Sequence, residues 1–84
     1  MTLDQIMQDD TLSNLGKAEA IHVFDGNGGP YNVHLSHDVN WKQNGTRFRS
    51  LRTAQAYATL IDNADDVDVV DLDGNIYQPG YIPA

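Results

Sequence analysis

Four aspartates near the C-terminus are the residues best placed to do chemistry. Asp66 and Asp68 lie two positions apart, and Asp71 and Asp73 repeat that spacing. On a strand, residues i and i+2 share a face with about 6.8 Å between their Cα atoms, which is similar to the spacing of phosphates along one nucleic-acid strand. The pattern predicts a strip of carboxylates that faces a partner and occupies a groove meant for nucleic acid. The alternative is that these charges only keep an edge strand from aggregating.

The same aspartates raise the question of calcium. The segment from Asp71 to Gly74 resembles the middle of a calcium-binding loop. With Gly74 at the sixth loop position, the first and twelfth positions fall on Val69 and Gly80, which carry no carboxylate. The pattern therefore predicts a turn and no calcium site.

Three histidines raise the question of zinc. His22 and His34 could be neighbours across a hairpin, and His37 and Asp38 follow closely. Imidazoles with one carboxylate can bind zinc, but scattered surface histidines fit the sequence as well, and we favour that interpretation. The chain has no cysteine, which excludes disulfides and thiolate zinc sites. We expect neither a metal nor a cofactor.

The sequence also argues against an enzyme. Ser36, His37 and Asp38 are contiguous, and adjacent residues of a strand point to opposite faces, so they cannot form a catalytic triad. The glycines of residues 26–29 lack the Lys and Ser or Thr of a phosphate-binding loop.

Charge is distributed unevenly along the 84 residues, whose net charge is −7. Residues 1–41 carry −5, residues 42–52 carry +4, and residues 53–84 carry −6 with no basic residue. So acidic a chain is repelled by phosphate, which argues against direct nucleic-acid binding. An acidic surface that meets a basic partner is the functional interpretation. A solvated surface with local ion pairs is the alternative.

Length and patterning predict a single α+β domain with an antiparallel sheet of four to five short strands. The expected order is helix, three strands, helix and two strands, with the second helix packed on one face of the sheet. Thr2 and Gln5 form a capping box that starts the first helix. Five segments are expected: an N-terminal helical segment over 1–16, a β-hairpin and third strand over 20–49, the main helix over 50–63, a C-terminal hairpin over 66–78, and a tail over 79–84.

The main helix is the best-defined element. Ser50 is its expected cap, and it has one apolar stripe made of Leu51, Ala54, Tyr57, Ala58 and Ile61. Leu60 falls opposite that stripe, near Arg52, so Leu60 and Arg52 form a second candidate contact surface. Trp41 is expected to anchor the preceding connector in the core.

No apolar run approaches the roughly 18 residues that a membrane helix needs. Residues 1–4 lack the basic region of a signal peptide. We therefore expect no membrane partner and a location in the cytoplasm, that of a host cell if the chain is phage-encoded.

One part of the chain resembles a known class of protein. It comprises residues 47–51, Ala54, Tyr57, Ala58 and residues 69–75, which together cover about a third of the chain and read as strand, capped helix, strand and Asp-Gly turn. With its small size, acidity and lack of cysteine, the chain resembles small phage and mobile-element inhibitors of the anti-CRISPR and anti-restriction type. The resemblance implies inhibition by occupying a host protein surface, without catalysis, and fixes no functional residues.

The prediction is thus a non-catalytic inhibitor that sets Asp66, Asp68, Asp71 and Asp73 against a basic, nucleic-acid-binding surface of a host defence complex. The alternative is a small structural or assembly module that forms homodimers through a sheet edge or through the Leu60 side of its helix.

Overall fold

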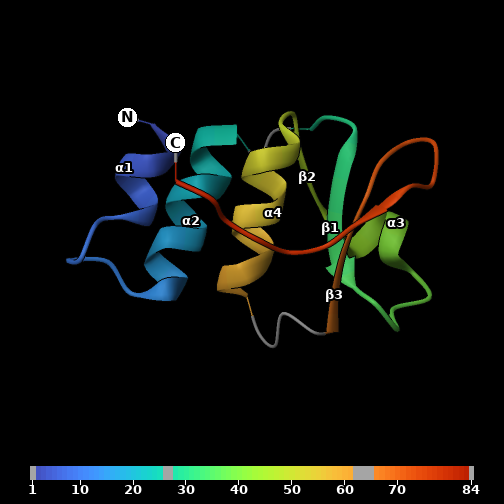
Figure 1. Cartoon of the computed structure of the whole chain (residues 1–84). Coiled ribbons are helices and arrows are strands. Elements are labelled where there is room, and N and C mark those ends of the chain that lie inside the picture. The colour runs from blue at the N-terminus through green and yellow to red at the C-terminus, as the bar shows by residue number, and fades with distance from the viewer. Residues whose placement is uncertain (1, 26–27, 62–65, 84) are drawn as a thin grey trace.

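A computed structural model describes residues 2–25, 28–61 and 66–83, and within them four helices and a four-stranded antiparallel sheet (Figure 1). This confirms the α+β class. The elements in chain order are α1 (Leu3–Met7), α2 (Asn14–Asp25), β1 (Tyr31–Leu35), α3 (Trp41–Asn44), β2 (Thr46–Phe48), α4 (Leu51–Leu60), β3 (Val67–Val70) and β4 (Ile76–Tyr77).

The sheet has the order β2-β1-β3-β4, with every neighbouring pair antiparallel. β1 is central and pairs with β2 on one side and with β3 on the other. Its Asn32 lies opposite Arg47 of β2 and opposite Val70 of β3, and Val70 in turn lies opposite Ile76 of β4. One continuous row of side chains therefore crosses all four strands.

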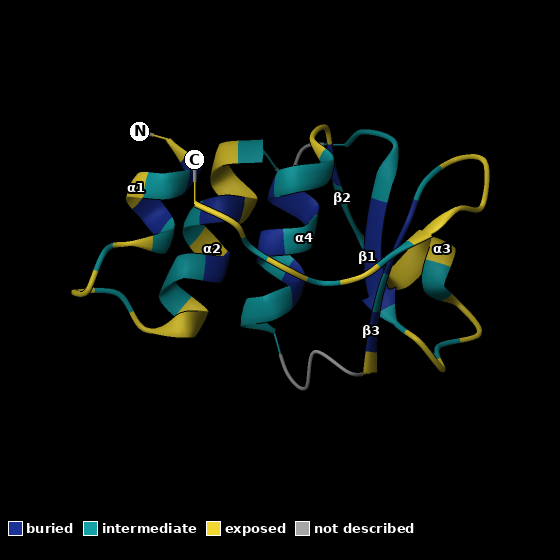
Figure 2. Ribbon diagram, in the orientation of Figure 1, coloured by how far each residue is buried: buried dark blue, intermediate teal, exposed yellow. Residues whose placement is uncertain are grey.

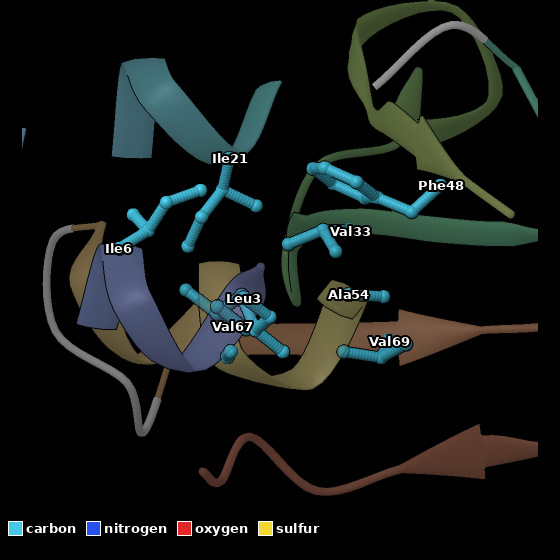
Figure 3. Close-up of a cluster of buried hydrophobic side chains, with 10 residues drawn as sticks. Leu3, Ile6, Ile21, Val33, Phe48, Ala54, Val67 and Val69 are labelled. Atoms are coloured by element: carbon cyan, nitrogen blue, oxygen red, sulfur yellow. The ribbon is translucent and has the colours of Figure 1, made fainter. Parts of the chain in front are cut away.

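The helices form layers on the two faces of the sheet. α4 lies between α2 and the sheet, α1 packs on α2, and the one-turn helix α3 lies on the opposite side of β1 and β3 (Figure 1). The main core fills the space between α1, α2, α4 and the first face of the sheet (Figure 3). Its buried members are Leu3, Ile6, Ile21, Val33, Phe48, Ala54, Ala56, Ala58, Val67 and Val69.

In the N-terminal region, the prediction from sequence is confirmed for α1 and wrong for α2. The capping box of Thr2 and Gln5 is present. The predicted strand over residues 20–25 is wrong, because α2 runs through it to Asp25. Ser13 begins this helix by accepting the backbone N–H of Gly16 on its hydroxyl at 3.1 Å, so Gly16 lies inside a helix that it was expected to end. Helical spacing then places Ala18 and Ile21 together in the core.

The connector before β2 is also helical. α3 occupies Trp41–Asn44, within the region predicted as a β-hairpin and third strand. Trp41 is half-buried, and its indole stacks on the imidazole of His34. The predicted anchoring of Trp41 in the main core is therefore wrong, because the indole lies on the opposite side of the sheet from that core.

The main helix confirms its predicted stripe. Ser50 occupies the N-cap position, where its N–H donates to the carboxylate of Asp25 at 3.1 Å and its side chain makes no capping bond. The helix ends at Leu60 with Ile61 in an extended conformation, and the predicted end at residue 63 lies outside the described residues. The prediction of Leu60 as an exposed contact is wrong. Leu60 is half-buried against the core because α2 covers the side of α4 that faces away from the sheet.

The C-terminal hairpin is present as β3 and β4. β1 and β3 pair without interruption from Leu35 opposite Val67 to Asn32 opposite Val70. Both valines are buried, one on each face of the sheet. After β4 the chain runs across α4, where Gly80 donates its N–H to the Gln55 carbonyl at 3.2 Å. This C-terminal segment, residues 78–83, is largely exposed on its outer side (Figure 2).

Candidate functional site

The second face of the sheet, which looks away from α4, carries the candidate site. Alternation along the strands turns Val33 and Val69 toward the core and Asn32, His34, Asp68 and Val70 toward this second face. Only α3 packs on this face among the described elements. Ile76 is 62% exposed and Leu72, in the adjoining turn, is 76% exposed, so the face keeps open apolar surface.

α3 is held to the second face by aromatic stacking and one weak hydrogen bond. The imidazole of His34 stacks on the indole of Trp41 with 4.8 Å between ring centroids and 27° between planes. The Lys42 ammonium lies 5.6 Å from the centroid of the same indole. Asn32 donates from Nδ2 to the Trp41 carbonyl at 3.4 Å. α3 thus brings an aromatic ring and a cation over the middle of the sheet.

The four predicted aspartates do not share one environment. Asp66 is exposed and precedes β3, where its carbonyl accepts the N–H of Ser36 at 2.8 Å. Asp68 is half-buried within β3 and lies opposite His34. Asp73 is exposed in the turn between β3 and β4. These three residues differ in exposure and lie before, within and after β3, so we describe them as a broken rim and not as a regular strip.

Asp71 has a different role, because both of its carboxylate oxygens accept hydrogen bonds within the hairpin. Oδ1 accepts the N–H groups of Asp73 and Asn75, both at 2.9 Å. Oδ2 accepts the Asn75 amide and the Tyr77 hydroxyl, both at 3.0 Å. The side-chain bond from Asn75 is the largest of the effects that lower the pKa of Asp71, and the bond to Asp71 raises the pKa of Tyr77. Asp71 therefore shapes the turn that displays Asp73.

The turn between β3 and β4 is one residue longer than the two-residue turn expected at Asp73 and Gly74. The Asp71 carbonyl accepts the N–H of Gly74 at 3.2 Å, and the Asp71 N–H donates to the Asn75 carbonyl at 3.1 Å. Gly74 has a φ of 85°, a left-handed conformation that glycine adopts without strain. The loop is thus a three-residue hairpin connection, the kind in which a type I turn is followed by one residue in the left-handed conformation.

Arg52 is engaged within the chain. Its Nη2 donates to the carboxylate of Asp4 and, at 2.9 Å, to the carbonyl of Ile82, and its guanidinium lies 5.4 Å from the Tyr81 ring centroid. The hydrogen bond to Asp4 raises the pKa of Arg52. Through Nη2, Arg52 links α1, α4 and the C-terminal segment. Leu60 is half-buried, so it offers less contact area than the sequence predicts.

The three histidines lie apart. His22 is exposed on α2, His34 is buried on the second sheet face, and His37 is exposed in the loop after β1. His22 and His34 are not neighbours across a hairpin, because His22 belongs to a helix, and His34 is buried and not on the surface as expected. Asp38 accepts hydrogen bonds from the Asn40 N–H at 2.8 Å and the Asn44 amide at 3.0 Å. In the part of the chain that the structure describes, no three His, Asp or Glu side chains are placed to hold a metal ion.

Sequence reasoning missed the basic and aromatic half of the second face. A cavity of about 230 Å³ opens there between β1, β2, α3 and the β3–β4 turn. Arg47, Lys42 and Trp41 contribute to its wall. The alternation of charged and apolar residues at Arg47, Phe48 and Arg49 already indicated that Arg47 faces away from the core, and this signal could have found it.

Comparison with known proteins adds no relative: no protein-family model matches the chain, and neither the curated proteins nor the solved structures contain a match. Over residues 2–25, 28–61 and 66–83, no helix has both the length and the apolar character needed to cross a bilayer.

Proposed function

We propose that this chain is a non-catalytic protein-binding module that sets the β3–β4 side of the second sheet face against a basic surface of a partner protein. The observation that carries the proposal is the composition of this face. Leu72 and Ile76 are exposed apolar side chains of the β3–β4 hairpin, which also carries the carboxylates of Asp68 and Asp73. Apolar area within a polar rim is the usual make-up of a protein interface.

The charge of the chain supports a basic partner. One ion pair, between Arg52 and Asp4, lies within the described residues. Most of the twelve acidic residues therefore have no opposite charge beside them there, and residues 53–84 contain no Lys or Arg at all. Uncompensated like charge accelerates encounter with a surface of opposite sign.

The hairpin is suited to displaying carboxylates because it is internally braced. Asp71 fixes the turn through four hydrogen bonds, so Asp73 projects from a defined loop and loses little freedom on binding. Together with the resemblance to small mobile-element inhibitors, this arrangement supports blockade of a nucleic-acid-binding surface of a host protein in the cytoplasm.

The test removes charge without changing shape. One double variant, Asp66→Asn with Asp68→Asn, and a single variant, Asp73→Asn, alter the proposed rim. The matched control, Asp10→Asn with Glu19→Gln, removes two exposed charges from the α1–α2 side. The wild-type chain captures its partner from the lysate of its host, and association is then measured at low and high salt.

The rim variants should associate more slowly with a shallower salt dependence, while the control keeps the wild-type rate. Asp71 is left intact because its replacement would change the turn. Equal association for all variants, or equal loss in rim and control, would overturn the proposal. A concentration-dependent dimer that survives high salt and captures no partner would favour the assembly module instead.

A further inference from the structure

We infer that the cavity on the second sheet face binds the carboxylate group of a small organic acid. We call this cavity the basic cup. Asn32 and Val70 form its floor, Trp41 and Leu72 form apolar walls, and Lys42 and Arg47 supply the cations. The inference concerns residues other than the aspartates of the proposed function and does not depend on it.

The cations of the basic cup, Lys42 and Arg47, make no ion pair with a described residue. These are two of only five basic residues in a chain of net charge −7, and both line one cavity. A guanidinium binds a carboxylate through two parallel hydrogen bonds, and a nearby ammonium adds a point charge.

One acidic residue lines the cup as well, so two cations and one carboxylate leave the lining with a net positive charge of one. Asp71 contributes to the wall, and its two oxygens already accept four hydrogen bonds from the hairpin. Its acceptor positions are therefore directed at the turn. Arg47 and Lys42 remain available to a ligand.

The floor of the cup is rigid and polar. Asn32 is 1% exposed, and its Oδ1 is buried without a hydrogen-bond partner. A Cβ built on Gly45 would lie 1.7 Å from that oxygen, so the Asn32 side chain packs directly against the Gly45 backbone. Its Nδ2 makes only the 3.4 Å bond to the Trp41 carbonyl. This weakly used donor lies in the same lining as the two cations.

Size and surroundings select the ligand. About 230 Å³ is below the range of roughly 300–1,000 Å³ that is usual for drug-sized ligands, so a single small ring or short chain fits. The indole of Trp41 and the Val70 and Leu72 side chains suit an apolar body. The net charge of −7 repels a polyanion such as nucleic acid, whereas a monoanion needs only the two cations.

The chain provides its own reporter, because Trp41 is its single tryptophan. Fluorescence of Trp41 is titrated with benzoate and, in parallel, with benzamide, which has the same shape without the charge. Benzoate should change the emission in a saturable way and more weakly at high salt. Benzamide should bind at least about tenfold more weakly, since charge-assisted hydrogen bonds are the stronger kind.

Matched variants locate the site. Arg47→Gln and Lys42→Gln should each weaken benzoate binding, with Arg47→Gln costing at least about tenfold. The control is Arg49→Gln, which removes an exposed cation two residues away that does not line the cup. Amide chemical shifts of Asn32 and Val70 provide a second readout that does not rely on the indole, and they also show that each variant is folded. If Arg47→Gln fails to fold, Lys42→Gln decides.

Three results would overturn the inference. Benzamide could match benzoate, which would make the cup a purely apolar site. Arg49→Gln could weaken binding as much as the cup variants, which would indicate a general effect of net charge. Benzoate could also shift amides elsewhere and leave those of Asn32 and Val70 unmoved.

Discussion

Arg52, in the first turn of α4, donates a hydrogen bond to the carboxylate of Asp4 in α1 and joins segments 48 residues apart. The hydroxyl of Tyr81, 77 residues from Asp4, donates to the same carboxylate oxygen. The hydrogen bond to Asp4 also raises the pKa of Tyr81. Three segments of the chain therefore meet at one carboxylate.

Replacing Arg52 should loosen the C-terminal segment. Arg52→Ala removes the bonds to Asp4 and Ile82 and the contact with the Tyr81 ring, so the melting temperature should fall. Arg52→Lys should recover part of the lost stability, because it keeps the positive charge. The recovery should be incomplete, because an ammonium lacks the planar fork of a guanidinium. Hydrogen exchange at the Gly80 amide, which is bonded to Gln55, should speed up in Arg52→Ala. The exposed Arg49→Ala is the control, and equal melting temperatures for both variants would contradict this role.

Ile21 tests the place of α2 in the core. Ile21 is fully buried, whereas Val23 on the same helix is 80% exposed. Ile21→Ala should cost about 2–5 kcal/mol of unfolding free energy, a large share of the roughly 4–13 kcal/mol available to a domain of this size. Val23→Ala should change little. Denaturant unfolding of both variants makes the comparison, and similar losses would argue for a strand in place of α2.

Gly45 is required by packing and not by backbone conformation. Its φ is −73°, which any residue adopts, but a Cβ would lie 1.7 Å from Asn32 Oδ1 and 2.8 Å from the Trp41 carbonyl. Gly45→Ala should therefore destabilise by about 1–3 kcal/mol. Adding Asn32→Ala to it should cost less than the two single losses combined, because the closest contact is then gone. Gly80→Ala, whose Cβ would meet nothing, should be close to neutral in thermal unfolding.

Asp71 should give the fold an acid-sensitive component. Hydrogen bonds, that from the Asn75 side chain first, hold its pKa below the ordinary value of 3.8. A lowered folded pKa stabilises the protein fully above 3.8, and this contribution is lost as the pH falls through the folded pKa. Asp71→Asn removes the charge and leaves one acceptor oxygen in place of two, so it weakens the hydrogen bonds that hold the turn. Its melting temperature should be lower than wild type at neutral pH, and the difference should shrink below pH 3.8.

The same variant has an alkaline readout. Donation to Asp71 raises the pKa of Tyr77 above 10.0, so Tyr77 contributes stability below pH 10 that is lost as the pH rises through its folded pKa. In Asp71→Asn the Tyr77 hydroxyl should ionise at lower pH, as followed by ultraviolet absorbance of tyrosinate. Asp73→Asn is the matched control. An unchanged Tyr77 titration in Asp71→Asn would contradict the hydrogen bond.

The sequence predicts elements well where the signal is local. The Thr2 capping box, the stripe of Ala54 and Ala58, and the hairpin after Val70 need only residues within a few positions, and all are confirmed. α2 was missed because Ile21, Val23 and Phe24 favour strands by type, while the burial of Ile21 depends on α1 and α4. Ser13 was the overlooked start signal.

The site was harder to predict because it depends on contacts between distant residues. Nothing near Arg47 in the chain indicates that Asn32 and Val70 lie beside it, since strand order and register follow from long-range pairing. Acidic spacing near the C-terminus correctly marked Asp66 and Asp73 as exposed. It could not show that the Asp71 carboxylate is directed back at its own turn, because Asx turns and strand positions carry the same residue type.

The bond from Tyr81 to Asp4 has a consequence for synthesis. A nascent chain that ends at residue 61 has already made α1, α2 and α4 but neither β3 nor Tyr81. The side of α4 that packs on β3 in the complete domain is then exposed to water. Arg52 also lacks its bond to Ile82, and Asp4 lacks its bond from Tyr81. The core is therefore complete only when residues 66–83 have joined the earlier helices, and a shorter chain exposes apolar surface of the kind that promotes aggregation.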